Sequence, residues 1–365
     1  MAGVLRASAL LRASIAPFTA QGEEGAMAIF ARLAEAVSLP PTRIMADYAA
    51  LSLGPGRVSL SDYERLRLYD EPFWGDADRR HVVGPRRFRE LCLRANFRHD
   101  WLGLTANRLA WRSYLAAHAL PTAPLLAIYR ADLATPAANL LRSRGELREF
   151  LTAHGATPVI AHPAEGGRSR GLFETPNGDA GAEIEALLED VADTPGVAWL
   201  LEPRLAPHPA LEAATAGRMA PVRVVTIAGE DGPRAFRALW RLPGAKGALA
   251  ELDLRTGRAL RVAPADNPGL SRRAPSALAV PDWPAMKAVA GEAARLLDAF
   301  GLVGWDIAPA AEGPVIVGVS AAPDLDACQM LQRSGLLDAE FQAFLADRRR
   351  LALDHARFVP DPLDG

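Results

Sequence analysis

The last third of the chain has the most regular pattern in the sequence, and this pattern restricts the fold more than any other feature. Val222 to Ala228 is β-branched and apolar, which is typical of a buried strand. Pro284 can begin a helix because its fixed φ suits the first helical position, and apolar residues then recur at helical spacing as far as Phe300. The remaining predicted strands cover residues 235–242, 248–254, 303–308 and 314–319. An order of three strands, a helix, a strand, a turn and a strand can build one lobe of a nucleotide-binding site.

Upstream of this region, helices and short strands alternate. Residues 22–70 predict helices, with Thr42 as the N-cap of one helix and Ser59 or Ser61 as the N-cap of the next. The following segments predict helices at 88–94, 107–117 and 145–153, and strands at 124–129 and 158–161. Because short strands alternate with helices, we predict the α/β (α+β) class.

The length of the chain sets the expected number of domains. A domain usually holds ~100–200 residues, so the 365 residues predict two or three lobes. We expect a helical N-terminal extension over residues 1–100 and a small lobe with a lid over 101–200. A larger C-terminal lobe is expected over 201–346, and a tail over 347–365.

Composition and charge argue against several classes of protein. Half of the residues are hydrophobic and 23% are charged, which is ordinary for a globular chain. The formal net charge of -2 gives no reason to expect a nucleic acid as partner, and no apolar run approaches the ~20 residues of a membrane span. Cys92 and Cys328 form no metal-binding spacing. We therefore expect a cytoplasmic protein; residues 1–21 resemble a transit peptide in composition, but an ordinary first helix is the simpler interpretation.

Several segments occur in an order that resembles one family. Residues 303–308, which read Val-Gly-Trp-Asp-Ile-Ala, and the strand at 313–317 carry the most specific part of the likeness. Residues 201–209 resemble a hinge that contacts adenine and ribose, residues 222–226 resemble an arginine strand, and residues 107–109 resemble the segment that opens the nucleotide site. Together they resemble the sugar-transfer associated ATP-grasp family, an alpha-L-glutamate ligase-like branch of the ATP-grasp superfamily. The likeness covers most of the chain, including its helical N-terminus.

This resemblance implies an ATP-grasp-like two-lobed fold that holds ATP between its lobes. Arg223, on the arginine strand, is the predicted catalytic residue, and Asp306 matches the first metal-binding carboxylate. Mg²⁺ prefers carboxylate oxygens, and guanidinium groups match phosphate oxygens. The positions implied for contacts with the nucleotide are Arg108, His162, Arg168, Arg170, Glu202, Leu205 and His208.

Three positions depart from the pattern of the family. Gly318 stands at the position of a metal-binding glutamate, Ser320 at that of an asparagine, and His162 at that of a phosphate-binding lysine. Glycine offers no side-chain ligand, a serine hydroxyl is a weak ligand, and histidine is mostly neutral near pH ~7. Arginine replaces lysine almost throughout this chain, which accounts for Arg108 but not for the other three. The departures therefore leave ATP as a possible ligand and make Mg²⁺ doubtful.

Each matched residue also has a simpler interpretation. Asp306 could pair with Arg223, Glu202 could be a surface residue, and His162 could be buried and neutral. The arginines of the glycine-flanked turn at 166–171 could belong to a solvated loop. If His162 instead faces a phosphate, its pKa should rise on binding, and ATP affinity should increase as the pH falls from about 8 to about 6.

Two functions of different classes are compatible with these residues. The first is an ATP-dependent carboxylate–amine ligase of cell-surface saccharide modification, which would pass an acyl-phosphate to a nucleophile. The second is a non-catalytic homologue that binds a nucleotide, a sugar or a protein in the same cleft. Both require Arg223, Asp306 and Gly318 to lie on neighbouring strands of one sheet, with Asp306 and Gly318 facing the same side.

Overall fold

A computed structural model describes residues 25–75, 77–130, 139–154, 158–165, 170–171, 180–192, 196–244 and 247–358. They form helices and two β-sheets, which confirms the predicted α/β (α+β) class. The chain divides into two compact units: the first takes Met1–Arg94, Arg261–Arg272 and Asp324–Gly365, and the second takes Ala95–Leu260 and Arg273–Pro323. Two segments from far along the sequence join the N-terminal part in the first unit, so this division differs from the predicted domain boundaries near residues 100, 200 and 346. Those boundaries stay predictions.

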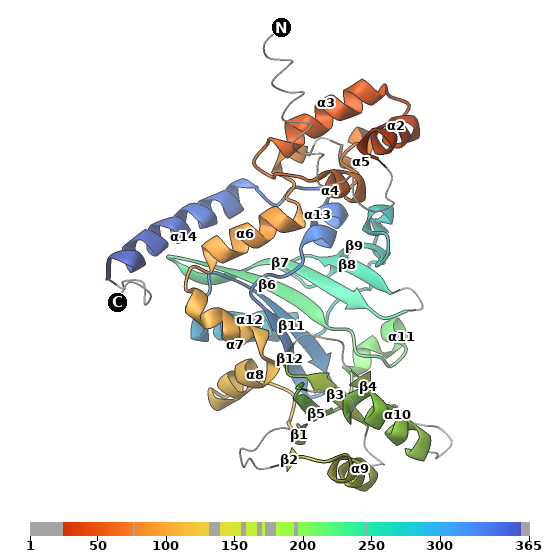
Figure 1. Ribbon diagram of the computed structural model, residues 1–365, viewed down its shortest axis with the longest axis vertical. Coiled ribbons are helices and arrows are strands. Elements are labelled where there is room, and N and C mark those ends of the chain that lie inside the picture. Colours follow the sequence, from red (N-terminus) through yellow and green to blue (C-terminus); the bar gives the residue numbers. More distant parts are fainter. Residues whose placement is uncertain are drawn as a thin grey trace. The chain divides into compact units, whose positions relative to one another are not determined.

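Helices dominate the first unit (Figure 1). They are α2 (Ala26–Ala36), α3 (Pro41–Ser52), α4 (Leu60–Arg65), α5 (Glu71–Trp74), the 3-10 turns η2 (Arg79–His81) and η5 (Pro268–Leu270), α6 (Pro85–Ala95), α13 (Asp326–Gln332) and α14 (Ala339–Phe358). The region 347–358, predicted as part of a tail, is the second half of α14.

Local sequence signals explain where these helices begin. Of the two predicted caps, Ser59 and Ser61, Ser59 caps α4, and it forms a capping box with Asp62. The predicted cap at Thr42 is wrong: α3 begins two residues earlier than this cap implies, with Pro40 at the N-cap and Pro41 at the first position. Proline suits that position because its fixed φ is helical and its missing N–H has no intrahelical partner there. The apolar faces of α2, α3 and α4 share one core that includes Phe30, Tyr48 and Tyr63.

Distant parts of the sequence close the first unit through backbone contacts. The buried Gln329 side chain accepts from the Val83 amide at 2.9 Å and donates to the Val83 carbonyl at 2.9 Å. Leu337 donates its amide to the His81 carbonyl at 3.0 Å. Only glycine fits at position 335, since a Cβ there would lie 2.3 Å from the His81 carbonyl carbon. The segment before α6 is therefore fixed by α13 and the loop after it.

A seven-stranded sheet has five of its strands, β6, β7, β8, β11 and β12, entirely in the second unit (Figure 1). Its strand order is β10-β9-β8-β7-β6-β11-β12, with β6 (Val222–Gly229), β7 (Gly232–Leu242), β8 (Ala248–Leu252), β9 (Ala259–Pro264), β10 (Arg272–Arg273), β11 (Leu302–Ala310) and β12 (Gly313–Ser320). The helix α12 (Trp283–Leu296) contacts β6, β7, β11 and β12. It buries the face that carries Met286, Ala290 and Ala293, as the predicted apolar periodicity requires.

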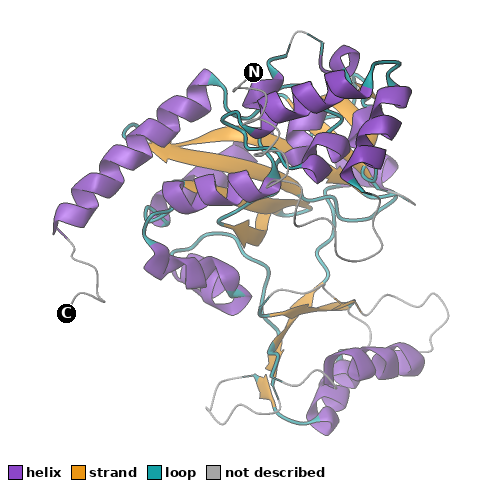
Figure 2. Ribbon diagram, turned by 45° about the horizontal axis from the view of Figure 1, so that its top comes forward, coloured by secondary structure: helices purple, strands orange, loops and turns teal. Residues whose placement is uncertain are grey.

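A smaller five-stranded sheet belongs to the same unit, with the order β2-β1-β5-β3-β4. The strands are β1 (Ala127–Tyr129), β2 (Leu140–Leu141), β3 (Val159–Pro163), β4 (Arg170–Gly171) and β5 (Trp199–Pro203). The helices α9 (Arg144–Ala153) and α10 (Ala180–Ala192) pack together beside it and share its core (Figure 2).

The segment before β1 and the connection between the two sheets are short helices and turns. They are η3 (His99–Trp101), α7 (Leu102–Ala106), α8 (Arg108–Ala117), η4 (Pro209–Leu211) and α11 (Glu212–Thr215). Across the described helices, none combines the length and the apolar composition that a membrane span needs.

Candidate functional site

The predicted catalytic arginine and the predicted metal ligand form an ion pair on adjacent strands. Arg223 of β6 lies opposite Asp306 of β11 in the antiparallel ladder. Arg223 Nε donates to Asp306 Oδ1 at 2.8 Å, and Arg223 Nη2 donates to Oδ2 at 2.7 Å. The side chains are 13% and 27% exposed, so the pair is largely withdrawn from water. A bidentate pair of this kind is a strong, geometrically specific interaction, and it occupies both carboxylate oxygens.

Gly318 of β12 is the partner of Asp306 on the other side. The strands that carry Arg223, Asp306 and Gly318 are thus neighbours in one sheet, as predicted. A Cβ built at Gly318 would lie 2.9 Å from Asp306 Oδ2, so position 318 faces the same side as the carboxylate. This arrangement is the one that the resemblance requires, but with a hydrogen atom where the family has a second carboxylate.

The donor set on these strands does not fit a magnesium ion. Mg²⁺ needs near-octahedral oxygen ligands and gains most from carboxylate charge. Asp306 is held by Arg223, Gly318 has no side chain, and the Ser320 hydroxyl accepts a hydrogen bond from the Ala322 amide at 3.3 Å. Within the described part of the chain, no group of three or more His, Cys, Asp or Glu side chains could hold a metal ion.

A second charged group links α8 to the two sheets, and we call its four members the Glu202 cluster: Arg108, Arg112, His162 and Glu202. Asn107 caps α8 through its side-chain oxygen, which fixes the start of the helix and places Arg108 in its first turn. Arg108 Nη2 donates to Glu202 Oε2 of β5 at 2.9 Å. Its Nη1 donates to the Val317 carbonyl of β12 at 2.7 Å. Arg108 thus joins the smaller sheet to the larger one.

The carbonyl that accepts from Arg108 lies at an irregularity of β12. Asp306 pairs with Gly318, but Ile307 pairs with Ile316, so Val317 is the extra residue of a β-bulge. A bulged residue has no ladder partner, which leaves its carbonyl available to a side chain. The bulge therefore connects the Arg223–Asp306 pair and the Glu202 cluster through adjacent residues of one strand.

Arg112 belongs to this cluster but is absent from the residues predicted by the resemblance. Its Nε lies 3.3 Å from Glu202 Oε1, and its Nη2 donates to the Ala123 carbonyl. Only 7% of its side chain is exposed, and burial lowers the pKa of Arg112 from its ordinary value. The signal for it is the spacing: Arg108 and Arg112 are four residues apart on one helix and so face the same side.

His162 lies against the same carboxylate without supplying a charge. Its Nε2 is 3.4 Å from Glu202 Oε2, the oxygen that Arg108 already contacts at 2.9 Å. Burial, and then the neighbouring Arg108 charge, lower the pKa of His162 from 6.5 to about 3. Two guanidinium groups already balance Glu202, so the carboxylate does not hold a proton on the imidazole. The low pKa keeps the imidazole neutral near neutral pH in this structure. The expectation that a bound phosphate raises this pKa, so that ATP affinity increases as the pH falls from about 8 to about 6, concerns the nucleotide-bound protein and stays a prediction.

The remaining predicted residues have different positions. Glu202 is 3% exposed, so the alternative of a surface residue is wrong. His208 Nδ1 accepts from the Ala210 amide at 3.1 Å and caps a 3-10 turn, while Leu205 is half-buried in the loop that precedes it. Arg168 lies outside the described residues, and Arg170 is described only by its backbone, which pairs with Ala161 in β3 and β4.

Comparisons with known proteins gave matches among solved structures alone. No family model matches the chain, and no curated protein matches it. The ATP-grasp ligase PsnB, solved with the precursor peptide PsnA2 and AMPPNP, is 15% identical with a TM-score of 0.39, covering 68% of this chain and 59% of that one. The D-alanine-D-alanine ligase from Coxiella burnetii is 12% identical with a TM-score of 0.42, covering 70% of this chain and 59% of that one.

A third solved structure is similar over a comparable share. The N5-carboxyaminoimidazole synthase from Aspergillus clavatus, solved with ADP and 5-aminoimidazole ribonucleotide, is 14% identical with a TM-score of 0.39. The aligned region covers 73% of this chain and 58% of that one. ATP-grasp ligases are thus among the solved structures that this chain resembles, and it spans less than two thirds of the length of these three. With TM-scores below 0.5, these similarities carry no argument about this chain, and its function has to be inferred from its own residues.

Proposed function

We propose that this chain is a divergent ATP-grasp-like protein that binds a nucleotide in its second unit without magnesium and without ligase turnover. The observation that carries the proposal is the pairing of Arg223, Asp306 and Gly318 across three neighbouring strands. The position and orientation match what an ATP-grasp metal site requires, but the chemistry does not. One carboxylate is neutralised by a guanidinium, and the residue opposite it has no ligand.

The charge balance around Asp306 supports the loss of the metal. Arg223 contacts both carboxylate oxygens at 2.8 and 2.7 Å, so a cation at this carboxylate has to displace a bidentate hydrogen-bonded partner. A dication near the guanidinium would also be repelled by it. Gly318 supplies no second carboxylate that would offset the lost hydrogen bonds and this repulsion. We therefore expect nucleotide affinity that is independent of magnesium.

The Glu202 cluster determines which part of a nucleotide can be held. Arg108 and His162 stand at the positions implied for phosphate binding, but Arg108 is engaged by Glu202 and Val317, and His162 is neutral. A phosphate at Arg108 would share the guanidinium with Glu202 and Val317, which take two of its five N–H donors, while the buried Nε has no partner among the described residues. The proposed nucleotide contacts of Glu202 and His208 are restricted in the same way, because each already accepts a hydrogen bond from protein.

A second candidate function is an ATP-dependent carboxylate–amine ligase, with cell-surface saccharide modification as its proposed pathway. The specific observation in its favour is that Arg223 and Asp306 are both present and adjacent. Such an enzyme would need another oxygen ligand in place of the carboxylate that is missing at position 318.

Calorimetric titration with ATP, in the presence and absence of millimolar Mg²⁺, separates the two functions. We expect the same affinity in both conditions and no release of ADP on incubation. A magnesium-dependent gain of about tenfold or more that disappears in Asp306→Asn would overturn the proposal. The paired substitution Gly318→Glu with Ser320→Asn should create a magnesium dependence that the wild type lacks. Gly318→Ala is the matched control, because it introduces the close approach to Asp306 Oδ2 without a ligand.

A further inference from the structure

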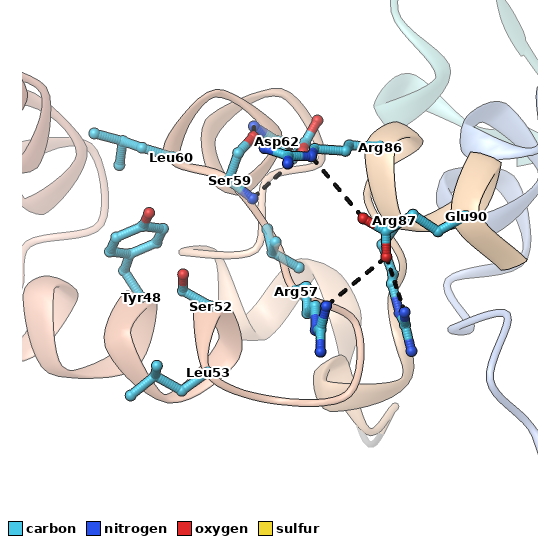
Figure 3. A pocket seen from close by; sticks show the side chains of 11 residues that line it. Tyr48, Ser52, Leu53, Arg57, Ser59, Leu60, Asp62, Arg86, Arg87 and Glu90 are labelled. Carbon is cyan, nitrogen blue, oxygen red and sulfur yellow. Dashed lines mark hydrogen bonds and ion pairs between the residues drawn. The ribbon is translucent and has the colours of Figure 1, made fainter. Parts of the chain in front are cut away.

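The first unit contains a cavity of about 680 Å³ that plays no part in the proposed nucleotide site. Its walls come from the second half of α3, the loop after it, the start of α4 and the first two turns of α6 (Figure 3). Tyr48, Leu53, Val58 and Leu60 supply an apolar side, and charged side chains from α6 and the loop supply the other. A volume of this size is typical of a site for a small organic molecule rather than for a bare ion.

Three guanidinium groups converge on one carboxylate at this cavity (Figure 3). Arg87 Nη1 donates to Glu90 Oε2 at 3.0 Å, while Arg57 Nη1 and Arg86 Nε lie 3.8 and 4.0 Å from Glu90 oxygens. The other carboxylate of the lining, Asp62, is bound by Arg65 at 3.0 Å and by Ser59. The cavity therefore carries more positive than negative charge, and two of its arginines are held only at long distances.

Those two arginines are also accessible. The side chain of Arg86 is 94% exposed and that of Arg57 is 64% exposed. Exposed ion pairs contribute little to stability, so an incoming anion can take these groups at small cost to the fold. Arg87 differs because its side chain is only 14% exposed, and its Nε is buried with no hydrogen-bond partner among the described residues. A buried guanidinium N–H without an acceptor is unfavourable, and an anionic oxygen would satisfy it.

The backbone around the cavity favours an anion as well. Arg86 and Arg87 occupy the first turn of α6, where backbone N–H groups lack intrahelical acceptors and the helix dipole is positive. The opposite side is fixed by the loop before α4: a Cβ at Gly56 would lie 1.9 Å from the Val82 carbonyl oxygen, and Arg57 has a φ of 46°. The chain thus holds Arg57 at the cavity in a conformation that a non-glycine residue rarely adopts.

We propose that this cavity binds a small organic phosphate monoester, with its phosphate held by Arg57, Arg86 and Arg87 and its carbon body against the apolar side. A phosphate monoester carries nearly two negative charges near neutral pH. This matches three guanidinium groups that share Glu90, since Asp62, the second carboxylate of the lining, is bound by Arg65. A monocarboxylate satisfies fewer of these donors, and its binding should therefore be weaker. The site is independent of the proposed nucleotide function.

Titration calorimetry of the full chain tests the assignment with three matched probes: glucose 1-phosphate, glucuronate and glucose. We expect glucose 1-phosphate to bind at least tenfold more tightly than glucuronate, and glucose to give no signal. Arg86→Ala should weaken glucose 1-phosphate several-fold, and the Arg57→Ala and Arg86→Ala double variant at least tenfold. Both side chains are exposed, so these variants should fold normally; Arg87→Ala should abolish binding, with circular dichroism as the check on its fold.

The matched control is Arg89→Ala, which removes an exposed arginine of the same helix that does not line the cavity. It should leave the affinity unchanged. An equal loss in Arg89→Ala and Arg86→Ala would mean that general positive charge, not this site, attracts the ligand, and would overturn the proposal. Equal binding of glucuronate and glucose 1-phosphate would overturn the phosphate assignment, and full affinity in the double variant would overturn the location.

Discussion

Each unit of this chain places several guanidinium groups around one carboxylate, but the two arrangements differ in burial and saturation. In the second unit, Glu202 is 3% exposed and lies 2.9 and 3.3 Å from Arg108 and Arg112. In the first unit, the Glu90 side chain is 37% exposed, and two of its three arginine neighbours lie at 3.8 Å or more. The two groups therefore differ in how far their charges are balanced within the protein: Glu202 has two close guanidinium partners, while two of the three arginines near Glu90 have no close hydrogen bond to it.

The largest effect is expected at the buried carboxylate. Glu202→Gln leaves Arg108 and Arg112 without their counter-charge in a site that excludes water. Breaking a buried pair by removing one partner is strongly destabilising, so we expect a loss of about 3 kcal/mol in the free energy of unfolding. Urea denaturation of the purified chain measures this loss.

The control for Glu202→Gln is Glu185→Gln. Glu185 also faces two arginines, Arg144 and Arg148, and is bound by Arg148 at 2.8 and 2.9 Å, but the three side chains are 41–48% exposed. We expect no measurable change in its denaturation midpoint. Equal midpoints for the two variants would show that burial does not distinguish these pairs.

A third carboxylate, Asp326, has a pKa on which burial has a larger effect than the nearby positive charge. Asp326 is 15% exposed and lies 2.8 Å from Arg65, which Asp62 also contacts. Burial outweighs this shared cation and raises the pKa of Asp326 from 3.8 to about 6. The folded chain then binds a proton more readily than the unfolded chain, so this group's contribution to stability is complete below a pH of about 4 and is lost as the pH rises through about 6.

Asp326→Asn tests this interpretation, because asparagine resembles the protonated acid. Above a pH of about 7 the variant should be more stable than the wild type by about 2 kcal/mol, and the two should converge near a pH of about 4. Thermal unfolding across this range measures the difference. Asp354→Asn, at an exposed carboxylate of α14, is the control and should follow the wild type. A less stable Asp326→Asn at alkaline pH would show that the pair with Arg65 outweighs burial.

The pKa of His162 indicates whether Arg108 and Arg112 already balance the charge of Glu202. Its pKa is lowered to about 3, so the unfolded chain takes up a proton at a higher pH than the folded chain does. This group's contribution to stability is therefore complete above a pH of about 6.5 and is lost progressively as the pH falls towards about 3. His162→Gln should remove this part of the acid sensitivity, worth about 1 kcal/mol near a pH of about 5 after allowance for its partial exposure. If the stability of His162→Gln and of the exposed-site control His99→Gln both change with pH as that of the wild type does, His162 is not held neutral by the cluster.

The sequence predicts five of the seven strands of the larger sheet because their signals are local, and it misses β9 and β10. The β-branched run at Val222 and the paired strands around a turn at Gly313 need no knowledge of the partner segments, and the structure confirms them. The helix α10 has the same kind of signal, with Ile184, Leu187 and Leu188 at helical spacing, but the prediction omits it. The second half of α14 is harder to predict, since three successive arginines interrupt its apolar positions.

The candidate site is only partly predictable, for a physical reason. Pattern matching assigns Arg108 and His162 to phosphate because of the residue types and their order. Residue types and their order do not reveal that an internal carboxylate, 94 residues away from Arg108 in the sequence, competes with an external phosphate for the Arg108 guanidinium. That outcome depends on how close Glu202 comes and how completely water is excluded, and both depend on tertiary packing. Arg112 contributes to the balance without belonging to any matched segment.

The smallest effect on stability is expected at Glu90, where the comparison between the two carboxylates is sharpest. Its pKa is lowered, first by the hydrogen bond from Arg87, so it is anionic near neutral pH and competes for the same guanidinium groups as the proposed ligand. Glu90→Gln removes this competitor from an exposed position, so the unfolding midpoint should stay unchanged while affinity for glucose 1-phosphate rises roughly threefold. Salt should weaken that binding in both proteins. Calorimetry and denaturation on the same samples measure the two quantities. A loss of stability like that of Glu202→Gln would mean that Glu90 is a structural partner of the arginines, and that the first unit uses its carboxylate as the second unit does.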